Sequence, residues 1–120
     1  MKFDLRLAAL VFAGGALGSA LRYWFSFQFE DDLWFLLAVN IAGTFALGLA
    51  QGNKNAPSWV NALFGTGFAG GFTTMSGLSL ILGMAHFYAL PMLYAYCFAM
   101  FIAAIGAYWL GQRITSGAKR

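Results

Sequence analysis

Charged residues are scarce in this sequence. Only 9% of its 120 residues are charged and 61% are hydrophobic, whereas about a quarter of the residues in an average soluble domain are charged. The composition therefore predicts an all-α integral membrane protein. The net charge of +3 does not indicate nucleic-acid binding, because the basic residues lie at the ends of the apolar segments.

Residue types that carry catalysis are also missing. The single cysteine, Cys97, excludes an internal disulfide and a cysteine metal site, and we expect it to fill space among helices. Asp4 and the acids at 30–32 lie at segment ends, so no apolar segment holds the paired carboxylates of acid–base catalysis. The sequence has neither a His and Cys cluster nor a phosphate-binding loop. We therefore expect no enzymatic activity.

Four apolar segments occupy most of the chain. Each is close to the roughly 20 residues that one membrane crossing needs. We expect a single domain over residues 1–120, with transmembrane helices at about 6–29, 33–50, 59–85 and 91–112. The apolar run after Lys2 and Arg6 predicts the first span rather than a cleaved signal peptide.

The third segment is rich in glycine. As a straight helix it would be about 40 Å long, against a bilayer core of roughly 30 Å. It contains Gly65, Gly67, Gly70, Gly71, Gly77 and Gly83. We predict that it is broken near its middle, at Gly70 and Gly71, because broken membrane helices free backbone groups that bind ions. The alternative is that the glycines only permit close helix packing.

Basic residues are distributed unevenly between the two ends of a four-span chain. Both termini and the second turn share one side, which holds Lys2, Arg6, Lys54, Arg113, Lys119 and Arg120. The other side has at most Arg22, beside three acids. The positive-inside rule then predicts that both termini lie in the cytoplasm and that the chain inserts in one orientation. We expect the membrane to be the plasma membrane.

Neutral hydrogen-bond donors are the polar groups within the spans. They are Asn40, Thr73, Thr74 and Ser76, with Arg22 near one end. Donors without neighbouring carboxylates suit an anion, since each hydrogen bond replaces part of its hydration shell. Freed carbonyls in the broken segment suit a small cation. For Asn40, an interhelical hydrogen bond is the alternative to an ion-lining role.

Three segments, taken in order, resemble the signatures of a known family. They are GGALGSALRY at 14–23, VNIAGTFALG at 39–48 and GFAGGFTT at 67–74. Together with the four-span length, they resemble the Fluc/CrcB family of fluoride channels. The resemblance implies a passive exporter that confers fluoride resistance, built as an antiparallel dimer with two narrow pores.

The same resemblance implies roles for individual residues. Asn40 would be the pore-lining amide, and the carbonyls of Gly70 and Thr73 would hold a central structural sodium ion. Arg22 would be the basic residue near the vestibule. The fluoride pathway expected on this basis comprises Arg22, Asn40, Thr74, Met75, Ser76, Leu78 and Tyr96.

The sequence departs from the family pattern along this pathway. Met75 and Leu78 occupy places where the family has phenylalanines whose ring edges face the ion, and Ile81 replaces a common acid. In the fourth span the family's polar track falls at Tyr96, Met100 and Ala104, so two hydroxyls are gone. A thioether or isobutyl group offers an anion less than an electropositive ring edge does.

The one-way topology and the altered pore lining together predict one subunit of a heterodimer, paired with a chain of opposite charge bias. One alternative is a homodimer in which Met75 replaces the phenylalanine. A second alternative is a subunit that supports assembly but does not conduct. A small multidrug-type antiporter would need an acid in the first span, and residues 7–21 contain none.

Overall fold

The computed structural model describes residues 4–29 and 33–117, and these residues are helical almost throughout. Part of the topology prediction rests on Lys2, the acids at 30–32, Lys119 and Arg120, which lie outside the described residues. The elements are α1 Leu5–Phe29, α2 Leu33–Gly52, α3 Ser58–Val60, the π-helix η1 Asn61–Ala69, α4 Gly70–Phe72, α5 Met75–Phe87 and α6 Pro91–Gly117.

Four helical segments in the described part of the chain are long and apolar enough to cross a membrane. They are Leu5–Phe29, Leu33–Gly52, Ser58–Phe87 and Pro91–Gly117. The prediction of an all-α, multi-pass membrane protein is therefore confirmed. The fourth segment continues to Gly117, five residues beyond its predicted end at residue 112.

Local signals fix where these helices begin. The Asp4 carboxylate accepts the N–H of Arg6 at 2.9 Å and caps α1. Pro57 precedes the third membrane segment, and Pro91 is the first residue of α6, where its missing N–H costs nothing. Ala89 takes a positive φ of 51° in the turn before α6.

The third segment is broken as predicted, but three residues later than predicted. Gly70 is helical, with φ −63° and ψ −38°, whereas Thr73 and Thr74 are extended, with ψ of 160° and 112°. Gly67 and Gly71 are packed against the backbone of α1, whereas an added Cβ on Gly70 would meet nothing within 4 Å. The hydroxyl of Thr74 makes the break possible because it caps α5 by accepting the N–H of Gly77.

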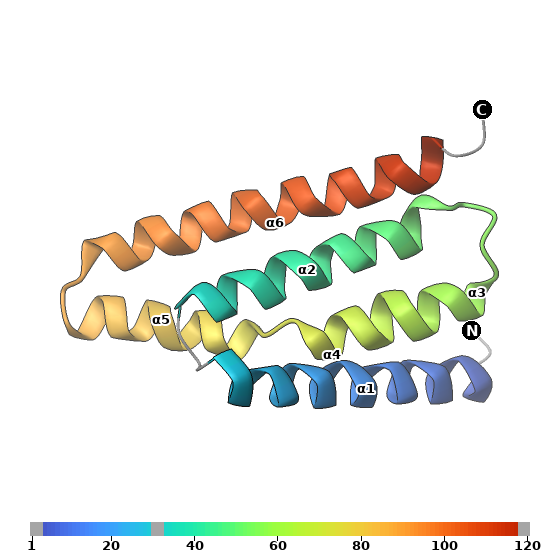
Figure 1. Ribbon diagram of the computed structural model, residues 1–120, viewed down its shortest axis with the longest axis horizontal. Coiled ribbons are helices and arrows are strands. Elements are labelled where there is room, and N and C mark those ends of the chain that lie inside the picture. The colour runs from blue at the N-terminus through green and yellow to red at the C-terminus, as the bar shows by residue number, and fades with distance from the viewer. Residues whose placement is uncertain (1–3, 30–32, 118–120) are drawn as a thin grey trace.

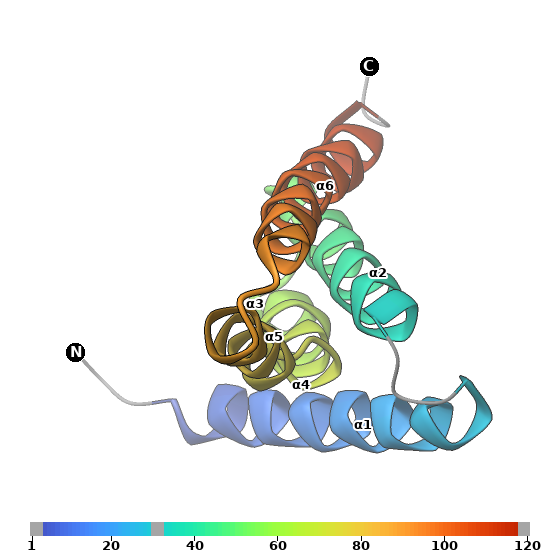
Figure 2. The same cartoon turned by 90° about the vertical axis from the view of Figure 1, so that its left-hand side faces the viewer.

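The helices pack as two pairs. α1 lies against η1 and α4, and α2 lies against α6; Figure 2 shows α1 crossing the third segment, with α2 and α6 together on its other side. The start of α1, the turn between α2 and α3 and the end of α6 share one end of the bundle (Figure 1). Arg6, Lys54 and Arg113 therefore lie toward the same end.

Glycine allows both pairs to approach backbone to backbone. A Cβ on Gly18 of α1 would meet the carbonyl oxygen of Phe68, and one on Gly48 of α2 would meet that of Tyr108. Side chains add a small apolar core between α5 and α6, which contains Cys97. The prediction that Cys97 fills space among helices is confirmed.

Candidate functional site

The break in the third segment is held open by a side chain from α2. In a continuous helix the N–H of Thr74 would bond to the carbonyl of Gly70, four residues earlier. Here it donates to Oδ1 of Asn40 at 2.9 Å. The break thus exchanges one intrahelical bond for an interhelical one, and α2 becomes the support of the two half-helices.

The other end of the Asn40 amide is also engaged. Its Nδ2 donates to the carbonyl of Leu36 at 3.0 Å, one turn earlier in α2. Longer contacts join it to the carbonyl of Thr74 at 3.5 Å and to Sδ of Met100 at 3.7 Å. Asn40 is 8% exposed. The interhelical hydrogen bond that the sequence offered as one alternative is present, and the ion-lining role stays a prediction.

Hydroxyl groups surround the start of α5. Oγ1 of Thr74 accepts the N–H of Gly77 at 3.2 Å and lies 3.0 Å from Oγ of Ser76. Met75, between them, is 67% exposed. The N-terminus of α5 carries a partial positive charge from the helix dipole. This end of α5 therefore offers neutral donors and a positive field, the chemistry that an anion requires.

Arg22 reaches the break from α1. Its Nε lies 3.4 Å from the carbonyl oxygen of Gly71, and Oγ of Ser19 donates to the same oxygen at 3.2 Å. Ser19 and Arg22 are three residues apart and share one helix face. Sequence reasoning missed Ser19 and the Gly71 carbonyl, although this spacing on a face otherwise lined by Gly14, Gly15 and Gly18 was a usable signal.

Two further predicted pathway residues lie in apolar surroundings. Leu78 is 3% exposed and packs with Ile81, Cys97 and Met100, and Tyr96 packs at the edge of this cluster. The hydroxyl of Tyr96 donates to the carbonyl of Leu33. The structure therefore joins Asn40, Thr74 and Ser76 through hydrogen bonds, but places Leu78 and Tyr96 in packing between α5 and α6.

A cavity of about 320 Å³ lies beside the predicted cation ligands Gly70 and Thr73. Its lining is Gly43, Thr44, Leu47, Gln51, Gly65, Thr66, Ala69, Gly70 and Thr73. The usual helical partner of the Gly70 carbonyl, the N–H of Thr74, is bonded to Asn40 instead. Neutral carbonyl and hydroxyl oxygens are the donors that hard cations prefer. The residues present therefore fit a small monovalent cation.

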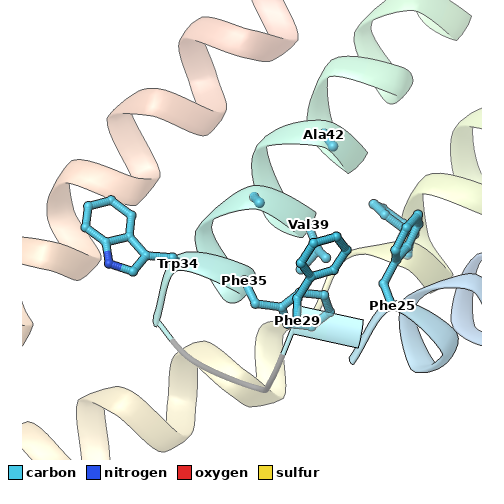
Figure 3. A pocket seen from close by; sticks show the side chains of 8 residues that line it. Phe25, Phe29, Trp34, Phe35, Val39 and Ala42 are labelled. Carbon is cyan, nitrogen blue, oxygen red and sulfur yellow. The ribbon is translucent and has the colours of Figure 1, made fainter. Parts of the chain in front are cut away.

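A second cavity, of about 410 Å³, has a different character. Its lining is Phe25, Phe29, Trp34, Phe35, Ala38, Val39, Ala42 and Phe72. Figure 3 shows that these side chains come mainly from the end of α1 and the first turns of α2. An almost wholly apolar lining suits hydrocarbon and not an ion. We do not place the ion pathway here.

Comparison with known proteins gives consistent matches. The family model described as CrcB-like protein, Camphor Resistance (CrcB), matches residues 9–112. The chain is 39% identical over 112 residues to "Fluoride-specific ion channel FluC 2" of Rhodococcus jostii, covering 89% of this chain and 96% of the relative. It is 35% identical over 120 residues to "Fluoride-specific ion channel FluC" of Gloeobacter violaceus, covering 89% and 94%.

Other relatives are matched over less of their length. "Fluoride-specific ion channel FluC" of Corynebacterium efficiens is 34% identical over 101 residues, which cover 84% of this chain but 65% of the relative. These relatives are named as ion channels, in agreement with the expectation that the chain is not an enzyme. The match of the family model over most of the chain, with the Rhodococcus relative covered almost end to end, shows that this chain belongs to the CrcB family.

Proposed function

We propose that this chain is a subunit of a passive, fluoride-selective channel that exports cytoplasmic fluoride through the plasma membrane. The observation that carries the proposal is the helix break between Phe72 and Met75, which brings the Asn40 amide and the Thr74 and Ser76 hydroxyls together in a chain of this family. No described membrane-spanning residue is an acid that would repel an anion.

The donors at the break can turn toward an ion at small cost. The hydroxyls of Thr74 and Ser76 share one hydrogen bond, so one of their two hydrogens is free to point outward. One hydrogen of the Asn40 amide makes only the contacts at 3.5 and 3.7 Å, which are weak. A fluoride ion passing the start of α5 would therefore be offered donors without breaking the bonds that hold the helices.

The remaining predicted pathway residues take different parts in this proposal. Met75 is exposed beside the donors and would line the pathway at the subunit surface. Arg22 lies on the α1 side of the break and would contribute positive charge near the vestibule. Leu78 and Tyr96 would line the pathway only beyond the donors, where the surroundings are apolar.

The proposed assembly is an antiparallel dimer, with a heterodimer favoured over a homodimer. Support comes from the charge bias, because Arg6, Lys54 and Arg113 lie toward one end of the bundle. By the positive-inside rule this end, with both termini, faces the cytoplasm. A chain that inserts in one orientation needs a second chain of opposite orientation to form an antiparallel pair. A homodimer in which Met75 replaces an aromatic ring stays the alternative.

A sodium ion is the proposed structural cofactor. The carbonyls of Gly70 and Thr73 would hold it, together with the matching carbonyls of the partner subunit. When bound, the ion would supply a fixed positive charge between the two subunits. Replacing sodium by N-methyl-D-glucamine is expected to lower the temperature at which the dimer dissociates, measured by gel filtration after heating; an unchanged temperature would argue against the site.

A non-conducting assembly subunit is the second candidate function. The observation that favours it is the burial of Leu78 and Met100 in an apolar cluster next to Asn40. An antiporter of the small multidrug type gains no support, because the described part of the first span contains no acid.

Growth of cells that lack their own fluoride exporter tests the proposed function. Co-expression of this chain with a relative of opposite charge bias is expected to restore growth in fluoride, and expression of this chain alone is not. Resistance from this chain alone would favour the homodimer. Resistance that persists in the pair after Asn40→Ala would favour the assembly subunit, and failure of the correctly inserted pair to restore growth would contradict the channel.

A further inference from the structure

Four buried apolar side chains fill the space between α5 and α6. Leu78, Ile81, Cys97 and Met100, here called the Met100 cluster, are each at most 7% exposed. Leu36, Leu37, Leu93 and Tyr96 pack around them. Leu78 lies one helical turn beyond Thr74, the N-cap of α5. The hydroxyl groups at the start of α5 therefore lead directly into an apolar region.

Met100 connects this cluster to the amide of Asn40. Its Sδ lies 3.7 Å from Nδ2 of Asn40, and both residues are buried. A thioether is only a weak hydrogen-bond acceptor. The amide edge that faces α6 is thus covered by an apolar side chain, where a hydroxyl or a water molecule would have given it a stronger partner.

The Met100 cluster offers no unpaired polar group that could bind a water molecule. Among the described residues, every buried side-chain nitrogen and oxygen has a hydrogen-bond partner. Buried water is held by two to four polar groups, and apolar spaces of this kind stay dry. An ion that leaves the donors at the start of α5 would have to shed its hydration shell without compensation, which is how hydrophobic constrictions stop ions.

We propose that Met100 and Leu78 close the passage between α2, α5 and α6 of this subunit, and that Met100 is the residue that decides whether water and anions reach the inner edge of Asn40. The identity of the excluded ion rests on the proposed fluoride function, but the dryness of the passage does not. Conduction would then follow the outer side of the donors, where Met75 and Ser76 are exposed at the surface of this subunit.

The single cysteine of the chain reports on this passage. Cys97 belongs to the Met100 cluster and is 4% exposed. The thiolate is the reactive form of cysteine, and its formation requires water. The measurement is the rate at which a water-soluble methanethiosulfonate reagent modifies Cys97 in membranes that contain the full chain in its native complex. Protein denatured in detergent sets the upper limit of the rate.

Substitutions of Met100 should change the rate of Cys97 modification in a predictable order. Met100→Leu keeps an apolar side chain of similar volume and should leave Cys97 as slow to react as in the unchanged chain. Met100→Ser adds space and a hydroxyl, and should raise the rate by at least about tenfold, since water can then reach the thiol. Met100→Ala should fall between them. Met92→Ser on the same helix, at a side chain that is 83% exposed, is the matched control and should change nothing.

Several outcomes would overturn the proposal. Rapid modification of Cys97 in the unchanged chain would mean that the passage is wet, and equal rates in the Leu, Ala and Ser variants would mean that Met100 does not close it. Gel filtration identifies any variant that has unfolded. If Met100→Ser has unfolded, the comparison of Cys97 modification rates between Met100→Leu and Met100→Ala tests the proposal. Fluoride efflux is measured separately: the expected labelling order without any efflux would contradict the fluoride function and leave the closed passage standing.

Discussion

At the scale of single residues, Asn40 explains how a polar amide is accommodated in a membrane helix. Its Oδ1 takes the N–H of Thr74, which the break deprives of its helical partner, and its Nδ2 bonds within α2 to the Leu36 carbonyl. A buried N–H without a partner costs about 1–3 kcal/mol. Asn40 is therefore a structural support of the break, whatever further role it has toward an ion.

The first prediction concerns this support. Asn40→Ala leaves the N–H of Thr74 unpaired and should lower the free energy of unfolding by about 1–3 kcal/mol. The measurement is denaturant unfolding in detergent micelles. Asn55→Ala, in the exposed turn after α2, is the control and should change stability by less than about 0.5 kcal/mol. Equal stability of the two variants would show that Asn40 does not support the break.

Single residues also show which features of the site could not be predicted from the sequence. A lone amide in an apolar run predicted a polar role for Asn40, but its partner Thr74 lies 34 residues away and depends on how α2 and the third segment are aligned. Met75 and Leu78 were predicted together as pathway residues. Their exposures are 67% and 3%: Met75 is the first residue of α5, beside the break, whereas Leu78 lies further along α5, where it packs against Cys97 and Met100 of α6.

At the scale of elements, the contact between α1 and the third segment is made by backbone. Added Cβ atoms on Gly14 and Gly18 would meet the carbonyl oxygens of Leu63 and Phe68, and one on Gly71 would meet that of Gly15. In hydrocarbon, close backbone packing replaces the hydrophobic effect as the source of helix association. The tight-packing alternative for the glycines thus describes much of what they do.

The second prediction tests this contact. The Cβ added by Gly18→Ala would also lie 2.8 Å from the amide nitrogen of Phe72, and backbone atoms cannot turn away as a side chain does. The helices must then separate, at a cost of about 1–3 kcal/mol. Gly106→Ala in α6 meets nothing within 4 Å and should be neutral or stabilising by up to about 1 kcal/mol. Thermal unfolding compares the two, and equal melting temperatures would contradict the packing argument.

The positions of the membrane-spanning helices could be predicted from the sequence, because they follow from the lengths of the apolar runs. Four runs of membrane-spanning length gave four spans, and glycine content gave a break in the third. The predicted position of the break was wrong by three residues, because glycine indicates backbone conformational freedom but does not show at which residue the helix is interrupted. Thr73 and Thr74 are the extended residues, and the signal that marks them is the capping hydroxyl three residues before Gly77.

At the scale of the whole molecule, the distribution of charge is the basis of the proposed orientation in the membrane. Arg6, Lys54 and Arg113 lie toward one end of the bundle, and Arg113 stacks 3.6 Å above the Trp109 ring. The sequence alone carries this bias. The proposed antiparallel partner is a prediction from this bias and from the family resemblance, but its contacts could not be predicted, because they depend on a surface that a single chain does not contain.

The third prediction follows from the bias. A protease-sensitive tag at the C-terminus of the unchanged chain should be protected in intact cells, since the proposed topology places this end of every copy in the cytoplasm. Arg6→Gln together with Lys54→Gln should leave part of the tag cleavable from outside. Lys54→Arg keeps the charge and is the control. If a large part of the tag on the unchanged chain is already cleaved, the one-way topology and the heterodimer argument fail.

Fluoride efflux is the most direct test of the channel. The complex is purified from its native membrane through a tag on this chain, reconstituted into liposomes loaded with fluoride and chloride, and followed with ion-selective electrodes. The expected result is rapid loss of fluoride with chloride retained, slowed strongly by Asn40→Ala and unchanged by Asn55→Ala. Retention of fluoride by liposomes that contain the folded complex would contradict the account.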